Sequence, residues 1–362
     1  MAKTLRVALS GCGKAGMAQL HCYALHPDCE IVALYDPDEG KAEKCAAQFG
    51  APSLPSYESL ARNAQADLIS LCGPESARCQ QALAALDHGA HVLCEKPFAN
   101  SLDECDAMIG SAARHKRSLL AFFNMRFHPV VQAVDELIAE IGEIYAARFS
   151  YTQFRTAVSW RHKLEQGGGV LKSQGVHAID LALGWLGPVS SVSGEMAIVH
   201  PAREVEDFAL INLRFESGAV GEVYAAYTDR QPEAMTAALQ GTRGKISFCL
   251  SPYQPEMNQV EITRSGATKS APLREYDALD PIYPGLLDSS KRAIAHIVDD
   301  IVLGRRSAMD GAAGRRSIEI VLAGYESQRR GTKVALPLQS FDASLLADCF
   351  PRFGSGDAEL WD

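Results

Sequence analysis

The feature that most constrains the fold of this chain is a glycine-rich stretch near its start, Ser10 to Gly16. An apolar run typical of a buried strand, Leu5 to Leu9, precedes it, and a helical pattern over Met17 to His26 follows it. Its glycines are spaced G-x-G-x-x-G. The first permits a tight turn, the second lets the backbone approach a diphosphate, and the third lets helix and strand pack closely. An ordinary tight turn can carry the same spacing, so the flanking sequence has to decide.

The flanking sequence favours a dinucleotide site. Glu30 to Tyr35 reads as a second strand, and it ends at Asp36, about 20 residues past Gly16, where a ribose-binding carboxylate is expected. The helix N-terminus would face the diphosphate. Asp36 would repel a 2′-phosphate and Pro37 supplies no cation, so NAD is favoured over NADP unless the following loop provides one. The residues expected to bind the dinucleotide here are Gly11, Gly13, Lys14, Ala15, Gly16 and Asp36.

The order of predicted elements divides the chain into two domains and a tail. Residues 1–124 alternate strands with helices, which predicts parallel βαβ units and an NAD-binding Rossmann domain. Residues 125–338 contain long strands without intervening helices, which predicts a largely antiparallel sheet. Residues 339–362 have weak periodicity and are expected to form a C-terminal tail.

Composition excludes several classes of protein. The 362 residues carry a formal charge of −9 and no Lys/Arg run, so no nucleic-acid partner is expected. Met1 to Arg6 is followed by a predicted strand and a glycine, so a signal peptide is not expected, and no apolar run reaches the roughly 18 residues of a membrane span. The ten cysteines form no C-x-x-C pair, which argues against a zinc ribbon, and no metal site is expected. Reduced thiols in a cytoplasmic protein are the simplest interpretation.

A second informative stretch is Cys94 to Phe98, at the carboxyl end of a predicted strand. Ligands of doubly wound sheets bind beyond the carboxyl ends of the strands, so Lys96 is expected to face the cofactor crevice. The alternative is a solvated surface lysine. Pro97 restricts the backbone here and argues for a held position.

The third stretch runs from Gly167 to Asp180, where three glycines lead into a predicted helix. Ser173 and His177 are four residues apart, and His177 and Asp180 three, so all three are expected to share one helix face. A histidine that titrates near neutrality suits proton exchange with a hydroxyl. The alternative is a packed histidine beside a capping aspartate.

These three stretches, in this order, resemble the glucose–fructose oxidoreductase/inositol dehydrogenase (Gfo/Idh/MocA) family, and the resemblance covers about residues 4 to 338. Further matching segments are Asn124 to Phe127, Trp160-Arg161, Glu206-Asp207, Gly241 to Gly244, and Tyr325 to Ser327 ahead of Gly331.

The resemblance implies an NAD(P)-dependent oxidoreductase acting on sugars, polyols or their derivatives. It implies a fold of the α/β class: an N-terminal Rossmann domain, then an α/β domain with an open, mainly antiparallel sheet. The second domain, residues 125–338, would be the substrate and oligomerisation domain, and the protein would assemble as a homodimer or homotetramer. By resemblance, Lys96 is the active-site lysine and His177 the acid/base. The residues expected near the substrate are Arg126, Trp160, Arg161, Ser173 and Asp180, and those expected near the cofactor are also Cys72, Gly73, Pro74, Glu95 and Lys96.

Two departures from the family pattern stand out. Family members usually carry Asp where this chain has Ser173, and a hydroxyl cannot support the imidazole with negative charge. Either His177 works with weaker support, or the substrate brings its own charge, or Asp180 or another carboxylate substitutes. From Gly73 to Arg78, where the family often reads Thr-Pro-Asn-x-x-His, only Pro74 is kept.

The resulting hypothesis is hydride transfer between a substrate secondary alcohol and the nicotinamide, with His177 as base and Lys96 stabilising the alkoxide. Two alternatives stay open: a non-enzymatic NAD- or sugar-sensing regulator, and a glycosidase that uses NAD in a transient oxidation. Arg126, Arg155 and Arg161 hint at an anionic substrate group, such as a uronate or a phosphate.

Overall fold

The computed structural model describes residues 4–159, 162–164, 166, 168–275, 284–342, 346 and 349–353. The chain forms two compact units, each described by itself below. Unit 1 comprises Met1–Asn124 and Ser289–Arg316, and unit 2 comprises Met125–Asp288 and Ser317–Asp362. The sequence-based division assigned residues 289–316 to the second domain, whereas in the structure they pack within unit 1.

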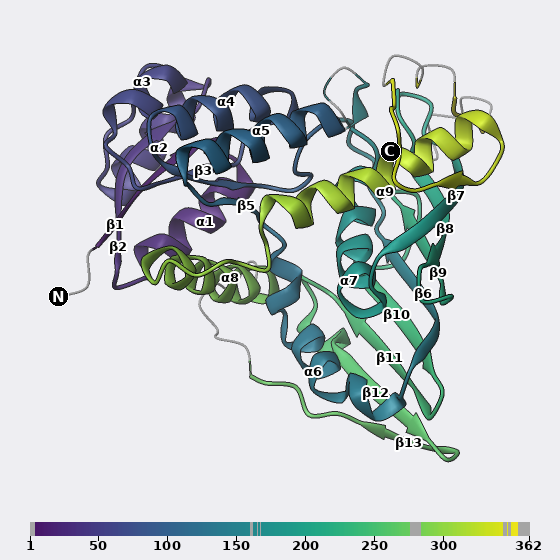
Figure 1. Cartoon of the computed structure of the whole chain (residues 1–362). Coiled ribbons are helices and arrows are strands. Elements are labelled where there is room, and N and C mark those ends of the chain that lie inside the picture. Colours follow the sequence, from purple (N-terminus) through teal and green to yellow (C-terminus); the bar gives the residue numbers. More distant parts are fainter. Residues whose placement is uncertain are drawn as a thin grey trace. The chain divides into compact units, whose positions relative to one another are not determined.

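Unit 1 is built on a parallel five-stranded sheet with strand order β2-β1-β3-β4-β5 (Figure 1). The strands are β1 (Leu5–Ser10), β2 (Cys29–Tyr35), β3 (Leu68–Leu71), β4 (His91–Cys94) and β5 (Leu119–Ala121). The order reverses direction at β1, because β2 lies on one side of it and β3 on the other. Ligands of such sheets bind at this switch point, beyond the carboxyl ends of the strands.

The helices of unit 1 begin and end where their capping residues place them. Asp38 and Ser101 accept a backbone N–H in the first turns of α2 and α5, and Gly50 ends α2 in a left-handed conformation. In Figure 1, α4 and α5 lie together on one side of the strands and α1 on the other. The helices are α1 (Lys14–Ala24), α2 (Glu39–Phe49), α3 (Tyr57–Asn63), α4 (Glu75–Asp87) and α5 (Leu102–His115).

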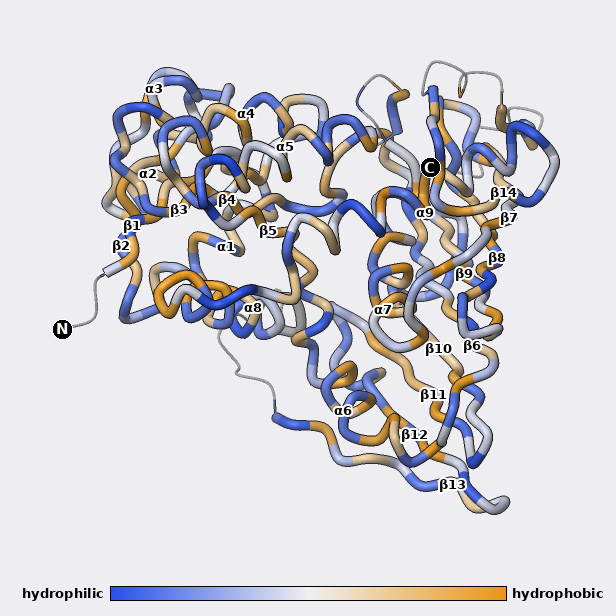
Figure 2. The backbone as a smooth tube through the Cα atoms, viewed as in Figure 1, coloured by the Kyte–Doolittle hydropathy of each residue, from blue (hydrophilic) through white to orange (hydrophobic). Residues whose placement is uncertain are grey.

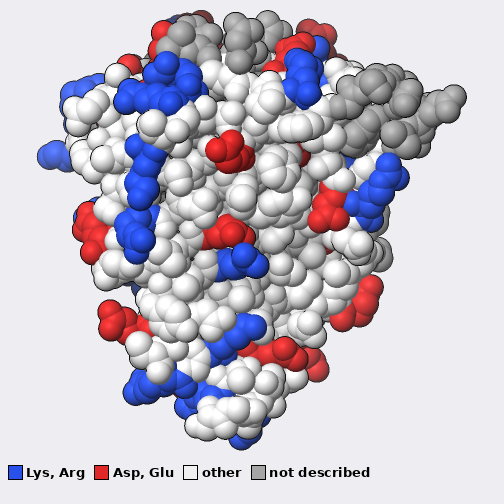
Figure 3. All heavy atoms as spheres, turned by 90° about the vertical axis from the view of Figure 1, so that its right-hand side faces the viewer, with Lys and Arg blue, Asp and Glu red and all other residues white. Residues whose placement is uncertain are grey.

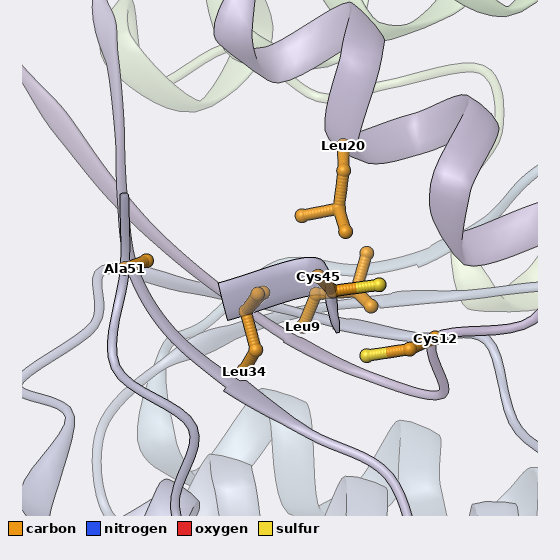
Figure 4. Close-up of a cluster of buried hydrophobic side chains, with 6 residues drawn as sticks. All are labelled: Leu9, Cys12, Leu20, Leu34, Cys45 and Ala51. Carbon is orange, nitrogen blue, oxygen red and sulfur yellow. The ribbon is translucent and has the colours of Figure 1, made fainter. Parts of the chain in front are cut away.

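A buried cluster lies directly beneath the glycine-rich stretch (Figure 4). It joins side chains of β1, β2, α1 and α2 to the first variable position of the loop. Its members are Leu9, Cys12, Leu20, Leu34, Cys45 and Ala51. Burial of these apolar groups holds the start of the loop to the sheet, while Gly13 and Lys14 further along it are exposed.

The later segment of unit 1 packs against the strand that ends the sheet. Asn124 donates to the hydroxyls of Ser289 (3.4 Å) and Ser290 (3.1 Å). A bridge also pairs Leu120 with Asp310. The sequence gives no local signal for this pairing, since the partners are more than 160 residues apart.

Unit 2 is built on a nine-stranded sheet with strand order β13-β12-β11-β10-β6-β9-β8-β7-β14. Only the β6–β9 pairing is parallel; the other pairings are antiparallel. The first strands are β6 (Ile144–Thr152), β7 (Val189–Ala197), β8 (Phe208–Phe215), β9 (Val220–Ala226) and β10 (Ala234–Gly241). The others are β11 (Gly244–Leu250), β12 (Gln259–Arg264), β13 (Ala267–Ser270) and β14 (Val334–Ala335). The expected mainly antiparallel sheet is confirmed, as is the α/β class.

Helices cover one face of this sheet, and the described residues place none on the other (Figure 1). Trp185 of α7 stacks on Phe149 of β6 at 6.1 Å between ring centroids, and α7 is hydrophobic along most of its length (Figure 2). The helices are α6 (Pro129–Leu137), α7 (Val176–Leu186) and α9 (Gly311–Arg330); α8 (Pro284–Val302) precedes α9. Single turns are 3-10 helices η1 (Asn124–Phe127), η2 (Ile138–Ile141) and η5 (Pro255–Met257), and a π-helix η4 (Leu171–Gly175). No helix in the described part of the chain is long and apolar enough to cross a membrane.

The segment beyond Leu338, expected to be a tail, makes specific contacts with unit 2. The ring of Phe350 lies 5.9 Å from that of Tyr325, edge to face. The N–H of Phe353 donates to the carbonyl of Ile198 at 2.9 Å. These contacts fix part of the segment to α9 and to the end of β7.

Candidate active site

The three glycines of the loop meet three different physical demands. Gly11 has a φ of +100°, and a Cβ there would lie 2.6 Å from the nitrogen of Gly73. A Cβ on Gly16 would overlap the carbonyl oxygen of Gly11. A Cβ on Gly13 would meet nothing within 4 Å. The first and third glycines are therefore required by packing within the protein, whereas the space over Gly13 is open to a ligand.

The start of α1 presents backbone donors without a competing acceptor. Gly13 is the N-cap and offers no side chain, and the first turn from Lys14 to Met17 contains no acidic residue. Free N–H groups and the positive helix end together favour an anion, such as a diphosphate.

Asp36 lies at the end of β2 and fixes the loop backbone. Its Oδ2 accepts the N–H of Cys12 at 2.7 Å, and its Oδ1 accepts the N–H of Asp38 at 2.9 Å. The following helix does supply a cation, Lys41, whose ammonium pairs with Asp38 at 3.0 Å. The carboxylates of Asp36 and Asp38 therefore outnumber the ammonium of Lys41 after β2, and this net negative charge disfavours the 2′-phosphate of NADP.

The loops after β3 and β4 are joined by Arg78, which the sequence identified only as a departure from the family's histidine. Arg78 is buried; it donates to the carbonyl of Gly73 at 2.7 Å and also to the carbonyl of Pro97. Pro74, at the N-cap of α4, follows the same loop. The backbone of Cys72 and Gly73, in turn, lies against Gly11. Arg78 thus holds three loops in one arrangement.

Lys96 follows β4 at the sheet edge that carries the glycine loop. Its neighbour Glu95 is half-buried and accepts from the amide of Gln19 (2.8 Å) and from the N–H of Lys96 (3.2 Å). Burial raises the pKa of Glu95, and the charge of Lys96 opposes that rise. Glu95 ties α1 to the end of β4, and Lys96 is held half-buried beyond it.

In unit 2, Ser173, His177 and Asp180 have different partners. Ser173 lies in the π-helical turn and donates to the carbonyl of Gly169 at 2.6 Å. The ring of His177 lies 6.0 Å from that of Tyr151. Sequence spacing assumed an unbroken α-helix, whereas the π-turn alters the rotation per residue between Ser173 and His177.

Asp180 is held by the arginine that was expected near the substrate. Its two carboxylate oxygens accept from Nε (2.7 Å) and Nη2 (2.5 Å) of Arg126, a bidentate pair. Asp180 is nearly fully buried, and Arg126 is a quarter exposed. The carboxylate is neutralised by this pair, which weakens the alternative that Asp180 replaces the missing aspartate. Trp160 and Arg161 lie outside the described residues.

A buried carboxyl, Glu206, anchors the turn that carries Ser173. Its Oε1 accepts from the N–H of Leu171 (3.0 Å) and the hydroxyl of Tyr325 (2.9 Å). Gly169, with a φ of +122°, leaves the space that this carboxylate fills. Burial raises the pKa of Glu206 to about 8, and the adjacent charge of Asp207 adds to the rise. The sequence marked Glu206 only as part of a matching segment.

Tyr227 completes this region, and sequence reasoning missed it as a site residue. It is fully buried, and its hydroxyl hydrogen-bonds to Ser173 Oγ. Because the Ser173 hydroxyl donates to Gly169, Tyr227 must be the donor in this second bond. No local motif marks Tyr227, which is 54 residues from its partner.

Comparisons with known proteins agree with this architecture. Residues 5–123 match a family model described as oxidoreductase family, NAD-binding Rossmann fold. Residues 131–247 match the GFO/IDH/MocA C-terminal domain. Together these two models span most of the chain.

Curated relatives and solved structures match almost end to end. D-apiose dehydrogenase of Paraburkholderia graminis is 25% identical, covering 92% of this chain and 90% of its own. D-xylose 1-dehydrogenase (NADP(+)) 2 of Haloferax volcanii is 26% identical, covering 85% and 92%. The structure of levoglucosan dehydrogenase in complex with NADH and levoglucosan superposes with a TM-score of 0.84 at 24% identity, covering 92% and 99%. At that identity, the structural likeness shows the fold.

Proposed function

Because the chain belongs to the GFO/IDH/MocA family of oxidoreductases, we propose that it is an NAD-dependent dehydrogenase of a sugar, a polyol or a sugar derivative. The observation that carries the proposal is the sheet edge of unit 1, where an unobstructed glycine loop and Lys96 both follow parallel strands. The sugar dehydrogenases among the relatives support the substrate class.

The residues present fit NAD. The open space over Gly13 and the uncapped start of α1 would take the diphosphate, and Asp36 would accept from the ribose hydroxyls. The pair Asp36 and Asp38 outnumbers the single Lys41, which supports NAD over NADP. When bound, NAD accepts hydride from the carbon that bears the reacting hydroxyl.

Two side chains are proposed to act on the reacting hydroxyl. His177 removes the hydroxyl proton, an assistance worth roughly 10²–10⁴ in rate. Lys96 donates a charged hydrogen bond to the developing alkoxide and stabilises it electrostatically. In the reverse direction, the same two groups assist reduction of a ketone.

A screen for NADH formation with NAD and a panel of sugars and polyols tests this function. Steady NADH production is the expected result. A sensing regulator is the second candidate, because Ser173 brings no charge to His177; tight NAD binding with no turnover would favour it. Cleavage of glycosides without net NADH would instead support the glycosidase alternative.

We also propose that the protein is a homodimer or homotetramer of the cytoplasm. The helix-free face of the nine-stranded sheet has broad uncharged areas, interrupted near the middle by a few acidic and basic groups (Figure 3). All ten cysteines are free thiols, in keeping with a reducing compartment. Light scattering coupled to size exclusion would give the subunit number, and a monomer would contradict the assembly.

A further inference from the structure

Three arginines suggested an anionic substrate, and the surroundings of one of them, Arg155, support a more specific inference. Arg126 is occupied by Asp180, and Arg161 lies outside the described residues. Arg155 follows β6, with its N–H bound to the carbonyl of Tyr227 at 3.0 Å. Its guanidinium lies 5.4 Å from the centroid of the Tyr227 ring. Backbone and ring together fix where this cation is placed.

Arg155 differs from its neighbour Arg203, whose charge is balanced inside the protein. Arg203 is fully buried, pairs with Asp207 at 3.0 Å and lies 5.5 Å from the same tyrosine ring. Within the described part of the chain, no carboxylate lies within ion-pair distance of Arg155. Its Nε donates to the amide oxygen of Gln153, a neutral acceptor. Of the two guanidinium groups beside the Tyr227 ring, that of Arg203 therefore has a carboxylate partner among the described residues and that of Arg155 does not.

Unsatisfied donors accumulate at the same place. The side-chain oxygen of Gln153 accepts from Arg155, which fixes the orientation of the amide and identifies its other atom as the Nε2 donor. This Nε2 is buried and has no hydrogen-bond partner in the described part of the chain. The Nε of Arg203 is likewise buried without a described partner. A buried donor left unpaired costs about 1–3 kcal/mol. An excess of donors and of positive charge calls for a ligand that only accepts, such as a carboxylate.

One series of contacts leads from this donor cluster toward His177. The guanidinium of Arg155 lies against the ring of Tyr227, and the hydroxyl of Tyr227 hydrogen-bonds to that of Ser173, four residues before His177. Tyr151, two residues before Gln153, has its ring 6.0 Å from the imidazole of His177, centroid to centroid. The positive charge of Arg155 lowers the pKa of the Tyr151 phenol, against the larger effect of burial, which raises it. The cluster is thus connected to the turn that precedes the proposed acid/base.

We infer that Arg155 and Gln153 bind a carboxylate of the substrate, so that the protein oxidises a sugar acid, a uronate or an aldonate, rather than a neutral sugar. The inference rests on the proposed function. Nη1 and Nη2 of Arg155, which have no hydrogen-bond partner among the described residues, match the two oxygens of a planar carboxylate. A phosphate dianion brings a second negative charge, whereas the cluster, as far as its residues are described, has one positive charge without a carboxylate partner, that of Arg155. The negative charge of the substrate would then take the place of the charge that an aspartate, in place of Ser173, would supply.

Matched pairs of compounds that differ only in a carboxylate or a CH₂OH group test the inference. Suitable pairs are D-glucuronate and D-glucose, D-galacturonate and D-galactose, and D-gluconate and D-sorbitol. Turnover with NAD and equilibrium binding to the NAD-loaded protein are both measured. The acid is expected to exceed its neutral partner in kcat/KM, or in affinity where turnover is absent, by about 10- to 100-fold in at least one pair.

Variants of Arg155 connect that preference to the residue. Arg155→Gln should collapse the acid-over-neutral ratio toward one, chiefly through KM, and Arg155→Lys should retain part of it because the charge remains. Arg148→Gln on β6 is the matched control, since Arg148 is exposed and pairs with Glu222. Melting temperatures identify a variant that has lost its fold, and Arg155→Lys then carries the test.

The outcomes separate this inference from the proposed function. Neutral sugars oxidised as well as or better than the acids would overturn the carboxylate site and leave the dehydrogenase intact. Acids that bind in an Arg155-dependent way without NADH formation would support the site and count against the dehydrogenase. Glucose 6-phosphate binding as tightly as D-glucuronate would overturn the commitment to a carboxylate. No acid preference in either measurement, or one unchanged in Arg155→Gln, would also overturn it.

Discussion

The glycine loop of unit 1 and the Ser173 turn of unit 2 are built in opposite ways. The loop presents backbone N–H groups, and its glycines matter because they lack side chains. The Ser173 turn is surrounded by buried side chains, among them Glu206, Tyr227 and Arg203. A backbone site suits a cofactor common to many enzymes, whereas a side-chain site is where substrate choice can vary. The difference indicates that the choice of substrate is determined by side chains of unit 2.

Lys96→Ala tests this contrast most strongly. Lys96 is a side chain proposed to take part in the reaction, yet it lies at the edge of the sheet of unit 1, where the cofactor site is otherwise formed by backbone N–H groups. The variant should lose at least roughly 10³-fold in kcat, because it lacks the ammonium proposed to stabilise the alkoxide. NAD affinity should be nearly unchanged, as measured by calorimetry. Lys44→Ala, on the exposed face of α2, is the control. Full activity in Lys96→Ala would refute the assigned role.

Two glycine substitutions separate packing from ligand access within the loop. Gly16→Ala should destabilise unit 1 by about 1–3 kcal/mol, because the added methyl overlaps the Gly11 carbonyl. Gly13→Ala should keep the melting temperature and weaken NAD binding at least about tenfold, because its methyl enters open space. Equal behaviour of the two variants in calorimetry and thermal melting would remove the distinction drawn between these positions.

Glu206→Gln tests whether unit 2 depends on a buried titrating side chain. The pKa of Glu206 is about 8 in the folded protein against 4.5 as the ordinary value. Between these values only the folded state holds the proton, so its contribution to stability falls as pH rises, by up to about 1.4 kcal/mol per pH unit. Glu206→Gln should therefore gain about 2 kcal/mol on wild type between pH 6 and 8, measured by urea unfolding. A constant difference across this range would contradict the raised pKa.

Asp36→Ala gives the smallest expected effect and concerns a side chain proposed to favour NAD over NADP. Loss of its negative charge should raise the NADP-to-NAD ratio of affinities by about tenfold, on the order of 1.4 kcal/mol. Dissociation constants for both dinucleotides check this. Asp28→Ala, beyond the loop, serves as the control. An unchanged ratio would shift cofactor selection to another residue.

The sequence predicted unit 1 better than unit 2 for a physical reason. Helices α2 and α5 carry their capping residues in the local sequence, which is enough to predict where they begin and end. The strands β7 and β10 have a weak sequence signal, because serine, glycine, alanine and glutamine dilute their apolar pattern. After α6 ends at Leu137, the chain continues as a 3-10 turn rather than an α-helix.

The same limit applies to the candidate site. Motifs named Ser173, His177 and Asp180, but they did not reveal what each one contacts. Arg126 lies 54 residues from Asp180 in sequence, and Tyr227 lies 54 residues from Ser173. Such pairings depend on how the nine strands order themselves, and no spacing rule encodes that. The donors around Arg155 became visible only when their partners could be traced.

The central claim is hydride transfer from a substrate carbinol carbon to NAD. The most direct measurement uses the best substrate of the sugar and sugar-acid panel, deuterated at the oxidised carbon, with mass analysis of the reduced cofactor. The account predicts that one deuterium appears in each NADH formed. NADH without the label, or substrate consumed without NADH, would contradict it.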